Sequence, residues 1–198
     1  MSVRSARRAA RVIPLRRIAL WVTIGVVSVG ALVAIAVANR TVPQIATSAP
    51  PISTLAKGDV APEFSATTSQ GAFDLASAPT PVFLEVFATW CPHCQRETAV
   101  LNRLYAKYGR RLAFVAVTGS PYASDRVSTE SEADVLAFGR YFNVRYPLAY
   151  DPSLSVANHY LQGGFPTIAI IGTDKRVRFV GSGEVPETTL ESQIRRAL

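Results

Sequence analysis

The chain has 198 residues, 48% of them hydrophobic and 18% charged, a composition that excludes an intrinsically disordered protein. Its net charge of +7 belongs to the N-terminus, where six arginines and no acidic residue precede residue 18, while the remaining 15 basic residues face 14 acidic ones. A nucleic-acid-binding protein needs a basic face on its folded domain. We therefore expect no nucleic-acid partner.

Residues 1–17 form this basic tail, and residues 18–38 follow without a charge. A helix of that length is about 31 Å long, enough to cross the hydrocarbon core of a bilayer. The positive-inside rule keeps the tail in the cytoplasm, so we predict a single-pass anchor in the cell membrane with the later residues outside the cytoplasm, in the periplasm or on the outer face. A cleaved signal peptide is the competing interpretation, because Ala36-Val37-Ala38 fits a cleavage site, although signal-peptide apolar cores are usually only about 7–15 residues long.

Residues 39–57 combine Pro, Ser, Thr and Ala without apolar periodicity, which is typical of a tether, and residues 58–198 have the composition of a globular domain. Apolar runs and alternation predict strands at 64–67, 72–75, 82–87, 112–117, 147–150, 167–171 and 177–180. Helical spacing predicts helices at 94–108, 131–142, 154–161 and 188–198. Ser131 and Asp134 have the spacing of a capping box that opens the second of these helices. The order of elements favours an α/β fold with a mixed sheet flanked by helices.

Cys91 and Cys94 are the two cysteines of the chain, and they stand two residues apart after the run 82–87. A thiolate is the attacking species in disulfide exchange, and a helix that begins near Cys91 places the positive end of its dipole at that sulfur. Pro92 fits the first helical turn, and His93 adds an electropositive group when protonated. Both effects favour the thiolate and make the disulfide easier to reduce. Cys94 lies one turn further on, and we expect it to be the more buried, resolving thiol.

Other uses of a cysteine pair fit this sequence less well. A structural disulfide across a two-residue gap is tight and gains little loop entropy. A zinc site needs about four ligands, and covalent haem attachment needs a histidine where Gln95 stands. We predict no metal and no cofactor other than the redox-active disulfide. Two further hypotheses stay open: a copper-handling protein that uses Cys91, Cys94 and His93, and a thiol peroxidase.

Three side chains around the pair are candidates for tuning its chemistry. Glu85 lies inside the apolar run, where burial would raise its pKa and let it take the proton from Cys94. The alternative for Glu85 is a solvent-facing position at a strand edge or a pair with an arginine. Glu97, one turn past Cys94, either lines the same cavity or is a solvated helix position. Trp90 either shields one side of the disulfide or serves docking.

Pro166 follows two glycines and Phe165, and it enters an apolar strand. A proline there cannot donate to the sheet, and a cis peptide bond before it would explain a tight approach to the disulfide, with an ordinary trans turn as the alternative. The Phe165 backbone would then be free to pair with a substrate strand. We place Gly164 and Thr167 in the same substrate-binding segment.

Three motifs together resemble the TlpA/ResA-type membrane-anchored, thioredoxin-like thiol-disulfide oxidoreductases: Ala61-Pro62-x-Phe64, Glu85-Val-Phe-Ala-Thr-Trp-Cys-x-x-Cys-x-x-Glu97, and Gly164-Phe165-Pro166-Thr167. The resemblance covers residues 58–198 and implies the thioredoxin fold, a cis Pro166 and a nucleophile at Cys91. It also places Glu85 where thioredoxins carry a buried acid and Glu97 where ResA-like members carry a cavity glutamate. Family members commonly reduce disulfides outside the cytoplasm, for example in apocytochrome c before haem attachment. The resemblance therefore implies exported thiol or disulfide proteins as substrates and an electron-transfer partner in the membrane.

One departure from the family pattern concerns the direction of electron flow. The family usually has proline directly before the second cysteine, whereas Pro92 follows the first cysteine here. The resulting Cys-Pro-His-Cys resembles DsbA, a strong oxidant whose histidine stabilises the reduced thiolate. The scaffold favours a reductase and the dipeptide favours a disulfide-forming oxidase. We lean slightly toward a reductase and keep the oxidase as the alternative.

Overall fold

The computed structural model describes residue 29 and residues 53–198. The chain divides into two units, residues 1–47 and residues 48–198. The predicted basic tail, almost all of the predicted span 18–38, and the first part of the predicted linker lie outside the described residues. Among the residues that are described, no helix is both long and apolar enough to cross a membrane.

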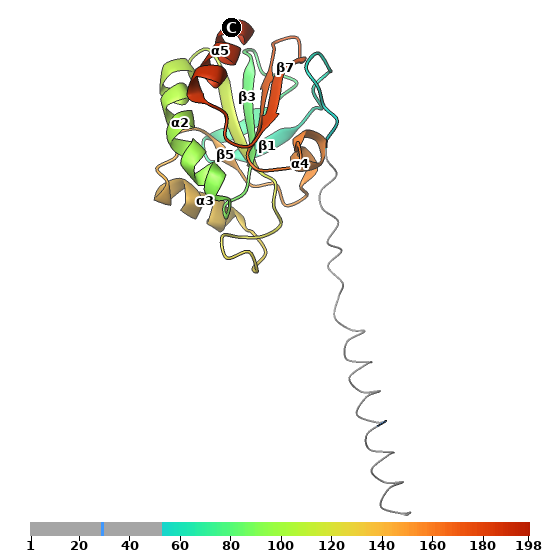
Figure 1. Cartoon of the computed structure of the whole chain (residues 1–198), viewed down its shortest axis with the longest axis vertical. Coiled ribbons are helices and arrows are strands. Elements are labelled where there is room, and N and C mark those ends of the chain that lie inside the picture. The colour runs from blue at the N-terminus through green and yellow to red at the C-terminus, as the bar shows by residue number, and fades with distance from the viewer. Residues whose placement is uncertain (1–28, 30–52) are drawn as a thin grey trace, which may run out of the picture. The chain divides into compact units, whose positions relative to one another are not determined.

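The described part of the second unit is built on a seven-stranded mixed sheet with the strand order β2-β1-β5-β4-β3-β6-β7 (Figure 1). Strand β3 runs parallel to β4 and antiparallel to β6. All six residues of β3 are buried, which confirms the buried strand predicted from its apolar run. The strands are β1 (Ser65–Thr68), β2 (Gly71–Asp74), β3 (Val82–Phe87), β4 (Ala113–Thr118), β5 (Leu148–Ala149), β6 (Thr167–Ile171) and β7 (Val177–Ser182).

Helices cover both faces of this sheet, and alternate residues of β3 point to opposite faces, so β3 contributes to two cores. Phe83 and Phe87 belong to a core shared with α2, α3 and α5, whereas Leu84 and Val86 belong to a second core shared with α4. Glu85 lies two residues from both Phe83 and Phe87, so it shares their face of the sheet, which α2 covers. The helices are α2 (Pro92–Tyr108), α3 (Glu132–Tyr141), α4 (Ser155–Tyr160) and α5 (Glu187–Ala197). The predicted mixed sheet flanked by helices is confirmed.

The element boundaries differ from the predicted ones by a few residues. Strand β7 continues to Ser182 because Gly181 and Ser182 still pair with β6. Helix α2 begins at Pro92, two residues before the predicted start. The capping box is confirmed: the Ser131 hydroxyl accepts from the Asp134 backbone N–H, and the Asp134 carboxylate accepts from the Ser131 backbone N–H.

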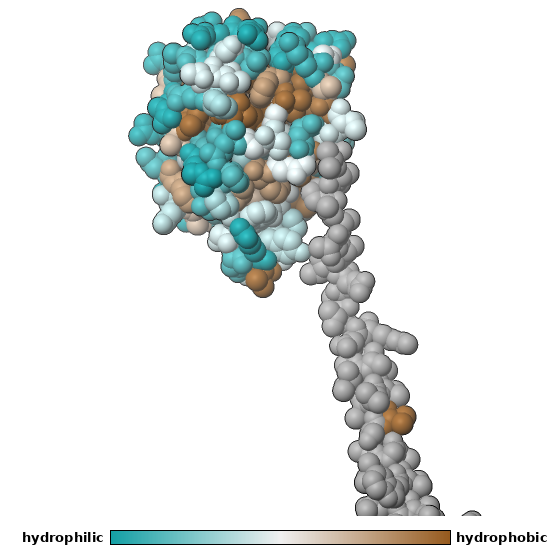
Figure 2. All heavy atoms as spheres, in the orientation of Figure 1, coloured by the Kyte–Doolittle hydropathy of each residue, from teal (hydrophilic) through white to brown (hydrophobic). Residues whose placement is uncertain are grey.

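The last residues of the predicted linker make hydrogen bonds within the folded unit. The Ser53 backbone N–H donates to the Leu161 carbonyl at 2.8 Å. The Gln162 amide donates to the carbonyls of Ser53 and Leu55, at 3.1 and 3.2 Å. The folded unit therefore includes residues before residue 58, because these backbone groups find partners beside α4. The visible face of the unit is mostly hydrophilic, with apolar side chains gathered in a few patches (Figure 2).

Candidate active site

Cys91 occupies the N-cap of α2, where its backbone is extended and Pro92 opens the helix. The Cys91 backbone N–H donates to the Ala88 carbonyl at 3.0 Å, which closes a tight turn after β3. Both cysteines are free and buried, with 4% of Cys91 and 1% of Cys94 exposed. The sequence folds this way locally because proline suits the first helical turn, where its missing donor is not needed. Cys91 is thus the outer sulfur at the positive end of α2, and Cys94 is the inner one.

Phe165 faces Cys91 from the segment that enters β6. The Cys91 thiol donates to the Phe165 carbonyl, with 3.5 Å between sulfur and oxygen. The Phe165–Pro166 peptide bond is cis, as the resemblance implied. Thr167 is fully buried, and its hydroxyl donates to the Gly164 carbonyl at 2.8 Å. Thr167 therefore holds the loop from inside rather than exposing its side chain, and the groups that face the cysteine belong to the backbone of Phe165.

Trp90 covers the site from the side of the loop between β4 and α3. Its ring packs edge-on against Phe165, with 5.8 Å between centroids, and its Nε1–H donates to the Ser120 hydroxyl at 2.8 Å. The Arg126 guanidinium lies 4.9 Å from the centre of the indole. The prediction that Trp90 shields the site agrees with this packing. Ser120 and Arg126 carried no local sequence signal, because they lie about 30 residues beyond the cysteines in an irregular loop.

Glu85 is buried on the face of the sheet that α2 covers, with 2% of the residue exposed. Burial is the main cause that raises its pKa to about 8, followed by the nearby Glu97, whereas the Tyr146 hydroxyl, which donates to Oε2 at 3.4 Å, opposes the rise. Burial also raises the pKa of Cys94, and the Glu85 carboxylate raises it further. The predicted burial and raised pKa are confirmed, and the solvent-facing alternative is wrong. Glu85 can therefore hold or accept a proton near neutral pH beside Cys94.

Glu97 is also buried, with 2% exposed, so a solvated helix position is excluded. Its Oε1 has no hydrogen-bond partner. Burial and, to a smaller extent, the charge of Glu184 raise its pKa to about 7. Two carboxyl groups thus lie on the inner side of the cysteine pair, and each changes protonation within about one unit of neutral pH.

A third buried acid, Glu130, supports the turn before Cys91. Its Oε1 accepts from the Thr89 hydroxyl at 2.8 Å, while Gln95 donates to the Thr89 carbonyl at 3.0 Å. Burial raises the pKa of Glu130 to about 6, and its Oε2 has no partner. These contacts hold Thr89, and with it the adjacent Trp90, from both sides of the turn.

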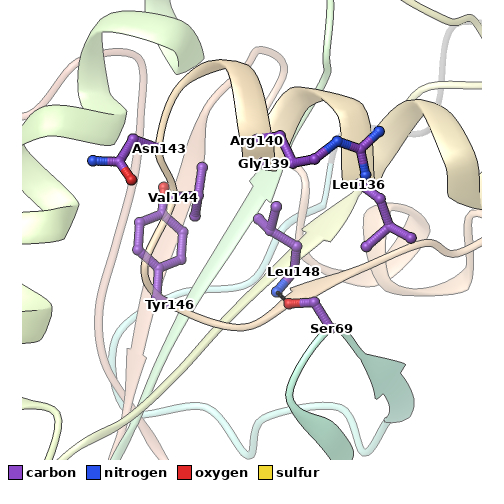
Figure 3. A pocket seen from close by; sticks show the side chains of 8 residues that line it. All are labelled: Ser69, Leu136, Gly139, Arg140, Asn143, Val144, Tyr146 and Leu148. Carbon is purple, nitrogen blue, oxygen red and sulfur yellow. Dashed lines mark hydrogen bonds between the residues drawn. The ribbon is translucent and has the colours of Figure 1, made fainter.

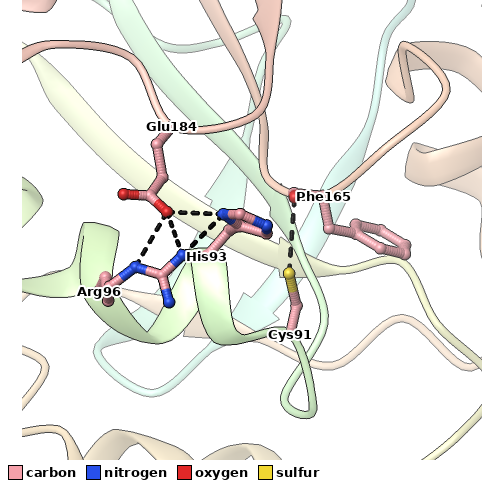
Figure 4. A network of polar contacts seen from close by, with 5 residues as sticks. All are labelled: Cys91, His93, Arg96, Phe165 and Glu184. Carbon is pink, nitrogen blue, oxygen red and sulfur yellow. Dashed lines mark hydrogen bonds and ion pairs between the residues drawn. The ribbon is translucent and has the colours of Figure 1, made fainter.

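His93 points away from the core and joins a network of charged groups beside the contact between Cys91 and Phe165 (Figure 4). Its Nδ1 lies 2.6 Å from Glu184 Oε1 and 2.8 Å from the nearest guanidinium nitrogen of Arg96. His93 therefore lies near the reactive sulfur, as predicted, and it contacts Glu184, a partner that the sequence did not reveal. Glu184 follows β7, 91 residues from His93, and no local pattern marks it.

Tyr146 lines a pocket beside α3 (Figure 3) and also donates a hydrogen bond to Glu85. The pocket is lined by residues of α3, by Asn143, by residues of the segment that leads into β5, and by Ser69. Tyr146 forms part of this lining and carries the hydroxyl that reaches Glu85.

Within residues 53–198, no group of three or more His, Cys, Asp or Glu side chains could hold a metal ion.

Comparison with known proteins identifies the family to which the chain belongs. The redoxin family profile matches residues 56–198. The thiol-disulfide oxidoreductase ResA of Bacillus cereus is 28% identical over 116 residues, which make up 58% of this chain and 62% of that protein. ResA of Geobacillus kaustophilus is 28% identical over 144 residues, 71% of this chain and 77% of that protein.

A solved structure agrees with these relatives. The crystal structure of a putative thiol:disulfide interchange protein DsbE from Chlorobium tepidum superposes with a TM-score of 0.63 at 27% identity, covering 73% of this chain and 99% of that one. The fold is therefore thioredoxin-like. The chain belongs to the redoxin family, and the relatives described above are ResA thiol-disulfide oxidoreductases.

Proposed function

We propose that this chain is a thiol-disulfide oxidoreductase that exchanges disulfides with exported proteins through Cys91 and Cys94. The observation that carries the proposal is the pairing of an outer sulfur, Cys91, at the start of α2 with the Phe165 carbonyl, while Cys94 lies buried beside Glu85. An outer thiol as nucleophile, an inner thiol that resolves the mixed disulfide and a proton acceptor are the three groups that the reaction needs.

The geometry supports a two-step reaction in the reducing direction. The Cys91 thiolate attacks a substrate disulfide held along the Phe165 backbone, forms a mixed disulfide and releases the first substrate thiolate, which takes a proton from solvent. Glu85 then accepts the proton of Cys94, and the Cys94 thiolate attacks the Cys91 sulfur. The second substrate thiolate leaves and takes a proton, so the substrate gains two electrons and two protons while Cys91 and Cys94 become a disulfide. A partner in the membrane then returns two electrons to the pair.

The proposed location rests on the sequence. Residues 18–38 are uncharged and follow a basic tail, which favours a single-pass anchor with residues 39–198 outside the cytoplasm. A thiol-reactive reagent that does not cross membranes tests this: in intact cells or spheroplasts it should label the variant Tyr141→Cys, because Tyr141 is exposed. Labelling only after lysis would contradict the proposed side.

The direction of electron flow has two candidates. The TlpA/ResA-type scaffold favours a reductase, and the names of the ResA relatives are neutral on this point. The observation that favours an oxidase is the Pro92-His93 dipeptide in the first turn of α2, next to the reactive sulfur. We propose the reductase as the function, with a DsbA-like oxidase as the second candidate.

Insulin reduction and the oxidation of a reduced peptide test the activity. Cys91→Ser should abolish both, and Cys94→Ser should accumulate a mixed disulfide with the substrate because the resolving thiol is missing. Full activity of Cys91→Ser would overturn the proposal. The reduction potential then separates the two directions, since about −120 mV marks a strong oxidant and about −270 mV a reductase.

A further inference from the structure

The charged network at the outer side of the site joins one acid to two bases. Glu184 Oε1 lies 2.6 Å from His93 Nδ1, and it accepts from two nitrogens of Arg96, Nε at 3.0 Å and Nη2 at 2.5 Å (Figure 4). The hydrogen bond to Glu184 is the main cause that raises the pKa of Arg96, and Cys91 contributes to a smaller extent. His93, which lies between the two cysteines, brings the network beside the Cys91 sulfur (Figure 4). The network therefore lies within electrostatic reach of the reactive sulfur.

Glu184 changes the net charge of this network. With Glu184 ionised, the three side chains carry a net charge of zero when His93 is neutral and one positive charge when it is protonated. Without Glu184, the two bases alone would carry one or two positive charges. His93 Nδ1 can accept from Arg96 in the neutral ring or donate to Glu184 in the charged ring, so the acid has a partner in both states. In either state, Glu184 removes one unit of positive charge from the surroundings of Cys91.

We propose that Glu184 sets the reduction potential of the cysteine pair by offsetting the positive charges of His93 and Arg96 beside it. It acts through those two side chains and is therefore a positioning residue. The inference rests on the proposed exchange activity and deepens it. Its consequence is a couple that is more reducing than Cys-Pro-His-Cys in the same place without the acid, which accounts for an oxidant-type dipeptide in a reductase-type scaffold.

The direction in which Glu184 changes the reduction potential follows from the charge of the reduced form. Reduction of the disulfide takes up two electrons, and at neutral pH it leaves a dithiol or a Cys91 thiolate with a thiol at Cys94. Positive charge near Cys91 favours the thiolate and so favours the reduced form, which raises the potential. Negative charge at Glu184 works against this and lowers the potential. On the inner side, the charge of Glu184 also contributes to raising the pKa of Glu97, so the acid acts on the pair from the outside and on its buried neighbour at once.

Helix α2 offers a matched control. Arg103 of α2 pairs with Glu187 of α5 at 2.8 Å, just as Arg96 of α2 pairs with Glu184. The two glutamates are similarly exposed, at 37% and 40% of their side chains. The Arg103 pair lies two helical turns further from the N-terminus of α2. Substitution of Glu187 therefore removes a similar surface ion pair at a greater distance from the sulfur.

The experiment equilibrates the full-length chain with glutathione. In this reaction the protein disulfide and two molecules of reduced glutathione give the protein dithiol and one molecule of oxidised glutathione. At pH 7 and low salt, E184Q should raise the equilibrium constant three- to tenfold, about 14–30 mV for a two-electron couple. E187Q should leave the constant within error of wild type. Arg96→Gln should move it in the opposite direction, toward a lower constant.

Ionic strength separates this role from a structural one. The difference between E184Q and wild type should shrink in 1 M salt, where the Debye length falls to about 3 Å. An acid that only holds its loop in place would change thermal unfolding without a salt-dependent change in the constant. The inference is overturned if wild type equilibrates with glutathione and E184Q has the wild-type constant. If wild type does not exchange with glutathione through Cys91 and Cys94 at all, it is the proposed function that fails.

Discussion

The two sides of the cysteine pair differ in the way their charges are held. On the inner side, Cys94 lies against Glu85, and burial dominates the pKa of both groups. On the outer side, Cys91 lies near His93 and Glu184, whose side chains are 58% and 40% exposed. A charge in the dry interior has a large and local effect, whereas an exposed charge has a smaller effect that salt screens. This difference supports the proposal that the inner side transfers the proton and the outer side adjusts the reduction potential.

The largest effect should come from the free-energy cost of ionising Glu85 in the interior. Its pKa is about 8 in the folded protein against an ordinary value of 4.5, so the folded state holds the proton more tightly than the unfolded chain. The stability that the protonated group contributes is fully present below about pH 4.5 and is lost as the pH rises through about 8. At about 1.4 kcal/mol per pKa unit, the loss is of the order of several kcal/mol.

Glu85→Gln should remove this loss, because glutamine stays neutral at every pH. The measurement is urea unfolding of the reduced protein between pH 4 and pH 9. If wild type and variant lose stability in parallel across this range, ionisation of Glu85 does not cause the loss. The contrast between a costly buried charge on the inner side and a screened charge on the outer side is then wrong.

The same substitution should also slow release of the substrate. Glutamine cannot accept the Cys94 proton, so resolution of the mixed disulfide should become about 100-fold slower at pH 7. Rapid-quench measurement of the mixed disulfide follows this step directly. Glu85→Asp keeps a carboxyl group and should recover part of the rate. Equal resolution rates for Glu85→Gln and wild type would remove Glu85 from the proton-transfer step.

A smaller effect is expected at Tyr146, whose hydroxyl donates to Glu85 and holds the pKa of that acid below the value that burial alone would give. Tyr146→Phe should raise the pKa of Glu85 further, so the pH profile of substrate release should shift to higher pH. At pH 7 the release rate should fall about three- to tenfold, which corresponds to the loss of one hydrogen bond of about 0.5–1.5 kcal/mol. A profile that keeps its midpoint would show that Tyr146 only fills space.

The smallest effect should come from the exposed ion pair between Arg103 and Glu187. Such pairs contribute little to stability because water and salt screen them. Arg103→Gln should leave both the thermal midpoint and the pH profile of release unchanged within error, as followed by circular dichroism and the same rapid-quench assay. A marked change in either would mean that exposed charge on α2 matters well beyond the first turns.

Local sequence signals predicted the fold and the core of the site. The run 82–87, the cysteine pair and the capping box at Ser131 each lie in one contiguous segment, so their patterns are visible without knowledge of tertiary contacts. Glu85 was found for the same reason, because a carboxyl group inside an apolar run stands out. The predicted membrane span lies almost entirely outside the described residues and stays a prediction.

The partners of these residues could not be found in the same way. Tyr146 reaches Glu85 across 61 residues, and the Ser120 hydroxyl that accepts from Trp90 lies 30 residues away. Each comes from a loop or strand end with no periodic pattern, and packing of the sheet and helices alone brings them together. The partner of a site residue is thus set by the tertiary fold, whereas the site residue itself can be recognised from its own segment of sequence.

The distance along the chain between His93 and Glu184 has a consequence for protein engineering. Pro92 and His93, the dipeptide between the cysteines, are the nearest residues at which a substitution could change the reduction potential. Here the acid that contacts His93 comes from the turn after β7, 91 residues away. A graft of Cys-Pro-His-Cys from this chain into another scaffold would therefore lack the acid. To transfer the reduction potential as well, the graft must include the turn after β7 that carries Glu184.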